Sequence, residues 1–243
     1  IMKYLSAIIF AIAIVVASIF LGNAYADRNK VNNSIEVTGL GKADFSSDLI
    51  VWEGRFGAQD INLKQAYITL EQNKATIDDY LSSKGINDNQ LIYSAVKTNQ
   101  KNKQVYSENG NYVGEEFVGY ELTQSIKIES KDVDKVEKLS REITELLNQG
   151  VKFYSEPPRY YYTKLADLKI EMISKATEDA RIRAEKISEF SGGNLGELQS
   201  ARMGIFQITG QNSNEDYSWG GTYNTSSREK TASITMKLNY EID

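Results

Sequence analysis

Two pairs of residues have the spacing at which a serine nucleophile and a lysine base operate in some acyl-transfer enzymes. These pairs are Ser94 with Lys97 and Ser227 with Lys230. The first pair lies in a predicted strand, 91–98, where side chains three positions apart point to opposite faces of the sheet. The second pair has no companion motif in the sequence. We therefore interpret both pairs as chance matches.

The chain contains no cysteine and no histidine. These absences exclude disulfides, thiolate nucleophiles, cysteine-ligated metal sites and histidine general bases. A hydrolase would have to use carboxylates, and the best candidates are Asp48 and Asp179. Since nothing in the sequence joins these two residues into a site, we expect a protein that is not an enzyme and has no cofactor.

Two further patterns resemble ligand sites without the context that such sites need. Gly39 and Gly41 begin like a phosphate-binding glycine loop, but Asp44 occupies the third glycine position and a strand is predicted to follow. We interpret these glycines as a bulge or turn. A late group of oxygen-bearing side chains lacks the spacing of an EF-hand, so we interpret it as a solvated loop and predict no metal site. This group comprises Asn212, Asn214, Glu215 and Asp216.

Aromatic residues cluster in two segments and are the best candidates for a binding surface. The first cluster follows Pro157 and Pro158, the only prolines, which indicate a stiff segment or a sheet edge. Aromatic and arginine side chains are enriched in protein interfaces. We expect these rings to cover a sheet edge, to mediate self-association or to bind a ligand. The residues are Arg159, Tyr160, Tyr161 and Tyr162 in the first segment and Tyr217, Trp219 and Tyr223 in the second.

The longest periodic segment is 164–190, which predicts a helix of about 40 Å. Its apolar residues recur every three or four positions, so one stripe should pack on a sheet. The predicted stripe comprises Leu165, Leu168, Met172, Ile173, Ala176, Ala180, Ala184, Ile187 and Phe190. Charged residues at the same spacing predict an ion network at the surface or in an interface. These are Asp179, Arg181, Glu185 and Lys186.

Shorter segments predict the rest of the fold. Alternation and turn residues predict strands at 35–38, 50–56, 91–98, 117–129, 151–155, 195–208 and 231–242, and helical periodicity predicts helices at 63–83 and 131–148. Asn109 and Gly110 predict a hairpin turn inside a polar loop between residues 98 and 117. The order ββαββ-αβαββ predicts an α+β fold, with mostly antiparallel sheets and helices packed on one face.

Residues 4–22 carry no charge and follow Lys3. Their length approaches that of a membrane-spanning helix, whereas the triplet 24–26, Ala-Tyr-Ala, resembles a signal-peptide cleavage site. Both alternatives place residues 27–243 outside the cytoplasm. An anchor would present its apolar side chains to lipid, including Tyr4, Ile9, Phe10, Val15 and Phe20.

We divide the chain into an anchor or signal peptide (1–26), a linker (27–33) and one domain (34–243). The domain could consist of two halves, 34–130 and 131–243. Its composition, 41% apolar and 25% charged, is typical of globular proteins. The net charge of −5 and the lack of a long basic run argue against nucleic acid as a partner.

Three motifs resemble the SIMPL-domain family of bacterial envelope proteins. They are an opening strand of the form apolar-x-Val-x-Gly-x-Gly, an acid before the next strand, and a helical Asp-Ala-Arg-x-x-Ala sequence. Ser47 precedes the acid where the family usually has proline. The resemblance covers about residues 34–242. The matching residues are Val37, Gly39, Gly41, Asp48, Asp179, Ala180, Arg181 and Ala184.

The resemblance implies an exported α+β domain, often oligomeric, without established catalytic residues. Some members are linked to envelope or oxidative-stress tolerance, and some assemble into rings or channels. We therefore predict a homo-oligomeric envelope protein on the periplasmic side, anchored in the inner membrane or cleaved and free in the periplasm. Other envelope proteins are further candidate partners. The alternative is a periplasmic ligand-binding module that uses the loop 210–227.

Overall fold

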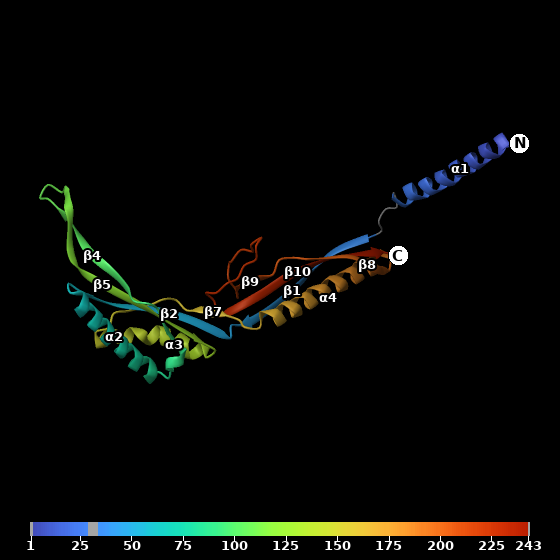
Figure 1. Cartoon of the computed structure of the whole chain (residues 1–243). Coiled ribbons are helices and arrows are strands. Elements are labelled where there is room, and N and C mark those ends of the chain that lie inside the picture. The colour runs from blue at the N-terminus through green and yellow to red at the C-terminus, as the bar shows by residue number, and fades with distance from the viewer. Residues whose placement is uncertain (1, 29–33, 243) are drawn as a thin grey trace. The chain divides into compact units, whose positions relative to one another are not determined.

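A computed structural model describes residues 2–28 and 34–242. The fold is α+β with antiparallel sheets, as predicted (Figure 1). The helices are α1 (Met2–Arg28), α2 (Leu63–Ser83), α3 (Val133–Glu142) and α4 (Leu165–Ser191), with 3-10 turns η1 (Asp88–Gln90) and η2 (Ile143–Gln149). The strands are β1 (Ser34–Ser46), β2 (Leu49–Asp60), β3 (Leu91–Tyr93), β4 (Lys97–Tyr106), β5 (Tyr112–Ser130), β6 (Phe153–Ser155), β7 (Arg159–Tyr161), β8 (Leu195–Met203), β9 (Gln207–Gly210) and β10 (Glu229–Ile242).

The chain forms two compact units, each assembled from separate segments. Unit 1 comprises Ile1–Leu40, Thr177–Met203 and Met236–Asp243, and unit 2 comprises Gly41–Ala176 and Gly204–Thr235. Neither unit coincides with residues 34–130 or 131–243. One sheet has the strand order β3-β5-β2-β6, with β4 beside β5 and β7 beside β2. The other has the order β1-β10-β8, with β9 beside β10.

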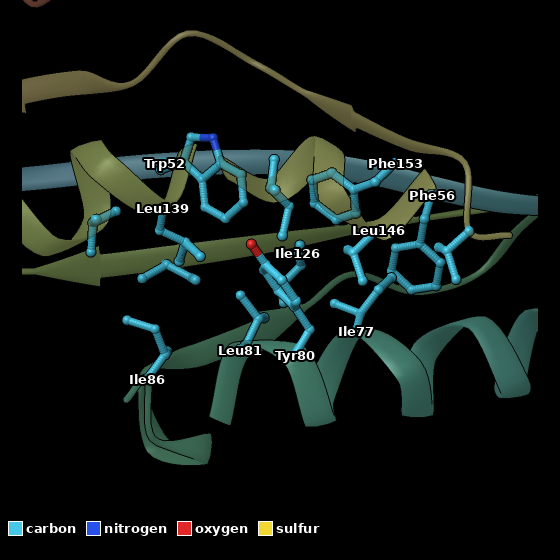
Figure 2. Close-up of a cluster of buried hydrophobic side chains, with 14 of the residues drawn as sticks. Trp52, Phe56, Ile77, Tyr80, Leu81, Ile86, Ile126, Leu139, Leu146 and Phe153 are labelled. Atoms are coloured by element: carbon cyan, nitrogen blue, oxygen red, sulfur yellow. The ribbon is translucent and has the colours of Figure 1, made fainter. Parts of the chain in front are cut away.

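The hydrophobic core of unit 2 lies between the β2–β5 ladder and the helices α2 and α3 (Figure 2). The two strands pair antiparallel over residues 50–60 and 120–130. Because side chains alternate along a strand, Trp52 and Phe56 share the inward face, where both are fully buried. The indole nitrogen of Trp52 donates a hydrogen bond to Ser155 Oγ at 3.0 Å, so its polar atom is satisfied. The helices and turns contribute Ile77, Tyr80, Leu81, Leu139 and Leu146 to this core.

The largest difference from the sequence prediction is a long hairpin where a polar loop is expected. β4 pairs with the first part of β5, and the pair continues out to Tyr106 and Tyr112. Asn109 and Gly110 lie at the tip, as predicted, and Gly110 has a φ of 78°. All 10 residues of β4 are exposed. The strand therefore lacks the apolar alternation from which strands are recognised in a sequence.

Three other predicted elements are divided differently in the structure. The strand predicted at 91–98 is β3 followed by the start of β4. The predicted helix 131–148 is α-helical only to Glu142 and continues as a 3-10 turn, which ends at Gly150 with a φ of 80°. The predicted strand 195–208 is interrupted between β8 and β9, where the amide of Gly204 donates to the carbonyl of Thr235.

The predicted stripe of α4 is correct as far as Ala184 and wrong beyond it. The buried row follows a strict four-residue spacing, so the next buried residue is Ser188, which is 1% exposed. Ile187 and Phe190 are 51% and 86% exposed. Helical periodicity predicts that Leu63, Tyr67 and Leu147 lie on the apolar stripes of their helices, but all three are exposed. Alternation along 231–242 predicts that Thr231 and Ser233 face outward, but both are buried.

The apolar N-terminal segment is helical throughout α1. Its described side chains, those of residues 9–23 and 25, are exposed and include Ile9, Phe10, Val15 and Phe20. The side chain of Tyr4 and the linker residues 29–33 lie outside the described part. In the part of the chain that the structure describes, no helix is long and apolar enough to cross a membrane.

Candidate functional site

The helical motif of the sequence analysis attaches α4 to β1 in unit 1. Asp179 Oδ2 accepts a hydrogen bond from the amide of Leu40 at 2.8 Å and forms an ion pair with Arg183 Nε at 2.9 Å. The amide of Leu40, with a smaller contribution from Arg183, lowers the pKa of Asp179 against the opposing effect of desolvation. Ala180 and Ala184 are fully buried beside it. Asp179 is therefore engaged in holding the helix, not in presenting a free carboxylate.

The other charged residues of this helix form the predicted ion network, although the pairs are local. Arg181 Nη1 lies 3.0 Å from Glu185 Oε1, and Lys186 Nζ lies 2.8 Å from Glu189 Oε2. The side chains of all four residues are at least 45% exposed. Exposed pairs of this kind contribute little to stability, about 0.3–0.5 kcal/mol each on a helix.

The glycines of the opening motif lie in a continuous strand, so the predicted bulge or turn is wrong. β1 runs without interruption from Ser34 to Ser46, with Val37, Gly39 and Gly41 all on its buried face. The reason for glycine at position 41 is the close approach of α4. A Cβ atom there would lie 2.2 Å from the carbonyl oxygen of Met172.

Asp48 fixes the segment that precedes α4. Its two carboxylate oxygens accept hydrogen bonds from the amide and the hydroxyl of Thr163, both at 2.7 Å. Beside it Ser47 donates its amide to the carbonyl of Arg228 at 3.0 Å, a bond that the family's usual proline could not make. Since its oxygens bond Thr163, Asp48 has a structural role in this arrangement.

A polar cleft of about 430 Å³ opens beside Asp48. Its arginine is paired, because Arg228 Nη1 lies 2.6 Å from Asp134 Oδ1 and 3.1 Å from Glu137 Oε2. Among the described residues, Ser47 Oγ and Arg228 Nε are buried beside the cleft without a hydrogen-bond partner. Lys131 and Lys164 also line the cleft and form no ion pair in the described part of the chain. The cleft therefore keeps cationic side chains that are not engaged in ion pairs.

The first aromatic segment is split between core and surface. Tyr160 is 8% exposed and belongs to the hydrophobic core, which removes it from the candidate surface. Tyr161 and Tyr162 are half-buried and contact Tyr223 and Phe45, with ring centroids 6.5 and 4.7 Å apart. Arg159 is exposed, and its Nη2 lies 3.7 Å from Glu53 Oε2. β7 pairs with β2, so Arg159, Tyr160 and Tyr161 themselves form a strand of this sheet.

The second aromatic segment is an ordered loop with an exposed tip. Trp219 is 96% exposed and Tyr217 is 67% exposed, whereas Tyr223 faces Tyr161. Glu215 accepts hydrogen bonds from the amide of Gly210 and from the side chain of Asn224, and so closes the base of the loop. The carboxylate is thus engaged inside the protein. Among the described residues, no group of three or more acidic side chains could hold a metal ion.

The two serine–lysine pairs have unrelated structural roles. Ser94 Oγ accepts the amide of Ser125 at 3.0 Å, and Lys97 belongs to the exposed strand β4. Lys230 is 1% exposed and directs its ammonium group to the carbonyls of Asn224 and Ser227. Burial lowers the pKa of Lys230 to about 8. Its hydrogen bonds close the late loop on β10, a role that sequence spacing alone does not indicate.

The surface that the sequence analysis missed is the outer part of the β4–β5 hairpin, which we call the hairpin surface. Six large apolar side chains are exposed there: Val105, Tyr106, Tyr112, Val113, Phe117 and Val118. Figure 1 shows this part of the hairpin extending beyond α2. The rings of Tyr106 and Tyr112 pack edge to face at 6.0 Å between centroids. Valine and tyrosine on both sides of the Asn-Gly turn are the one sequence signal that could have identified it.

A family model described as SIMPL, protein of unknown function (DUF541), matches residues 35–239. The chain belongs to the SIMPL family. The matched range agrees with the resemblance predicted for about residues 34–242, and it contains every motif residue from Val37 to Ala184. No curated protein matches the chain. The SIMPL description assigns no activity, so function has to be inferred from the surfaces of the chain itself.

Proposed function

We propose that this SIMPL protein is a non-enzymatic component of the bacterial cell envelope that self-associates through its hairpin surface. The main observation in support is that six large apolar side chains are exposed on the two-stranded outer part of the β4–β5 hairpin. Isolated two-stranded ribbons are marginally stable in water, and contiguous exposed apolar residues mark interaction sites. Assembly would bury these side chains and order the ribbon. The engagement of Asp48 and Asp179 in structural hydrogen bonds supports a role without catalysis.

The N-terminal helix supports a location outside the cytoplasm. Its side chains from Ile9 to Leu21 are exposed and, apart from Ser18, apolar, a composition suited to the interior of a bilayer or to an export signal. We propose that α1 directs the chain to the inner membrane and that residues 34–242 lie on the periplasmic side. A role in envelope or oxidative-stress tolerance fits this place and is the phenotype to examine first in a deletion strain.

Extraction of the full chain from its native membrane tests both parts of the proposal. Intact mass should show whether residues 1–26 are retained. In a mild detergent, light scattering should then give a multiple of that subunit mass, which is 27.3 kDa if all 243 residues are present. A strict monomer at every concentration tested would overturn self-association. Recovery of the protein only in the cytosolic fraction would overturn the location.

The exposed tip of the late loop favours a second candidate function, binding of a periplasmic ligand such as a glycan. Trp219 has almost its whole side chain in water, which is unusual for a residue of its size. If the loop binds glycans, Trp219→Ala should weaken binding about tenfold or more in a screen of glycans and peptidoglycan fragments. Phe190→Ala is the matched control, since Phe190 is an exposed aromatic residue outside the loop. Equal binding by both variants would reject this function.

A further inference from the structure

The two outer edges of the β4–β5 hairpin carry opposite charges. β4 contains Lys97, Lys101 and Lys103 and no acidic residue. The outer part of β5, residues 112–119, contains Glu115 and Glu116 and no basic residue. The charge of each edge is therefore uniform, and the two edges are complementary to each other.

Both edges also have unpaired backbone groups. In the part of the chain that the structure describes, β4 pairs only with β5, so its second edge has no partner strand. β5 pairs with β2 only from Tyr120 onward, so residues 112–119 have no partner strand on that side among the described residues. Unpaired strand edges readily accept another strand through main-chain hydrogen bonds. The hairpin thus has unpaired backbone N–H and C=O groups along the outer edge of the basic strand β4 and along the outer edge of the acidic part of β5.

We propose that the β4 edge of one copy pairs antiparallel with the outer β5 edge of the next copy; this rests on the self-association proposed above. In one register this pairing places Lys103 opposite Glu116 of the neighbour, with Lys101 two residues along on the same face of the strand. It repeats the arrangement inside each hairpin, where Lys103 is opposite Glu116 and Lys101 Nζ lies 3.5 Å from Glu121 Oε1. Lys103 would then lie between the Glu116 side chains of two copies.

Charge also disfavours the alternative in which identical edges meet. Two β4 strands side by side would place lysines against lysines, and two outer β5 strands would place glutamates against glutamates. Like charges directly opposite each other destabilise a strand pair, and edge lysines are a common protection against self-pairing. A head-to-tail contact between different edges remains. Such contacts repeat in one direction and close into a ring when the rotation allows it.

The test is a full-length variant in which the charges of the two strands are exchanged: Lys101→Glu, Lys103→Glu, Glu115→Lys, Glu116→Lys and Glu121→Lys. The exchange preserves opposite charges within the hairpin, so the ribbon should fold. It also preserves complementarity between two copies of the variant. Against the wild type, however, every head-to-tail contact would bring like charges together.

We expect the variant to assemble alone to the same size as the wild type. After co-expression, native mass spectrometry in detergent should find mixed oligomers at least about tenfold below the random proportion. Mixing at the random proportion, or an excess of mixed over pure oligomers, would overturn the head-to-tail pairing while leaving self-association intact. Failure of a folded variant to assemble alone would also overturn it. A wild-type protein that is monomeric would instead refute the proposed function itself.

Discussion

We expect Gly41→Ala to destabilise the protein by about 3 kcal/mol, because the added methyl group would collide with main-chain atoms. A Cβ at this position would lie 2.2 Å from the carbonyl oxygen of Met172 and 3.1 Å from the nitrogen of Ala176. Main-chain atoms inside a helix cannot rotate away as the end of a side chain can. The helix would have to move off the strand, which would loosen the fully buried residues Met172 and Ala176.

Thermal unfolding of the full chain provides the measurement. The midpoint should fall by about 6–12 °C, given about 2–4 °C per kcal/mol for a protein of this size. Gly220→Ala is the matched control, since the nearest atom to a Cβ there is Ser218 Oγ at 3.9 Å and its φ is not positive. The control should be neutral or slightly stabilising. Equal midpoints for the two variants would show that α4 and β1 are not in close contact.

The fold was predictable where hydrophobic periodicity is strong. The alternation of Ile50, Trp52 and Phe56 predicts the inward face of β2, and all three residues are fully buried. The four-residue row of α4 likewise predicts Ala176, Ala180 and Ala184 as its packed face. Both patterns succeed because one face of each element is removed from water over its whole length.

The hairpin could not be predicted in the same way, because neither of its faces is buried in one copy of the chain. Residues 97–106 contain mostly lysine, asparagine and glutamine, which is a composition typical of loops. Their strand conformation depends on pairing with β5, a contact that leaves no alternating pattern. The candidate surface predicted from the sequence therefore includes Tyr160, which is a core residue, but neither Tyr112 nor Val113, which are exposed.

Hydrophobic periodicity also could not predict single residues whose identity or burial depends on a local three-dimensional contact. The sequence identifies Gly41 as a motif residue. The reason that glycine is needed there is the close approach of α4, which lies more than a hundred residues later in the chain. Ser188 is polar but buried, because it occupies the next position of the four-residue row on the packed face of α4. Such cases depend on three-dimensional contacts that a single sequence does not reveal.

We expect Lys230→Met to destabilise the protein by about 2–4 kcal/mol at neutral pH, although methionine fits the same space. The ammonium group of Lys230 donates to the carbonyl of Asn224 at 2.7 Å and to the carbonyl of Ser227. It also lies 3.3 Å from Asn224 Oδ1. The thioether of methionine cannot donate a hydrogen bond, so these buried acceptors would lose their partner. The base of the late loop should loosen as a result.

The same lysine should make stability depend on pH in a direction opposite to that of a lysine whose pKa is raised by an ion pair. Burial lowers the pKa of Lys230 to about 8, while the nearby Glu215 acts to raise it. In the unfolded chain the pKa of lysine is about 10.4. Between these values the unfolded chain binds more protons than the native protein, so the free energy of unfolding should increase as the pH rises. Below about pH 8 the cost of the buried charge is present in full.

Urea unfolding of the full chain between pH 7.5 and 9.5 isolates this contribution, since tyrosines ionise only at about pH 10 in the unfolded state. The wild type should become more stable across the interval relative to Lys230→Met, so the difference between them should widen as the pH rises. Lys237→Met is the matched control in the same strand, where an exposed lysine lies 2.7 Å from Glu36. It should cost under about 1 kcal/mol at every pH. A wild-type curve parallel to that of Lys230→Met would mean that Lys230 keeps an ordinary pKa. Such a result would show that its three hydrogen bonds fully replace the water it loses on folding.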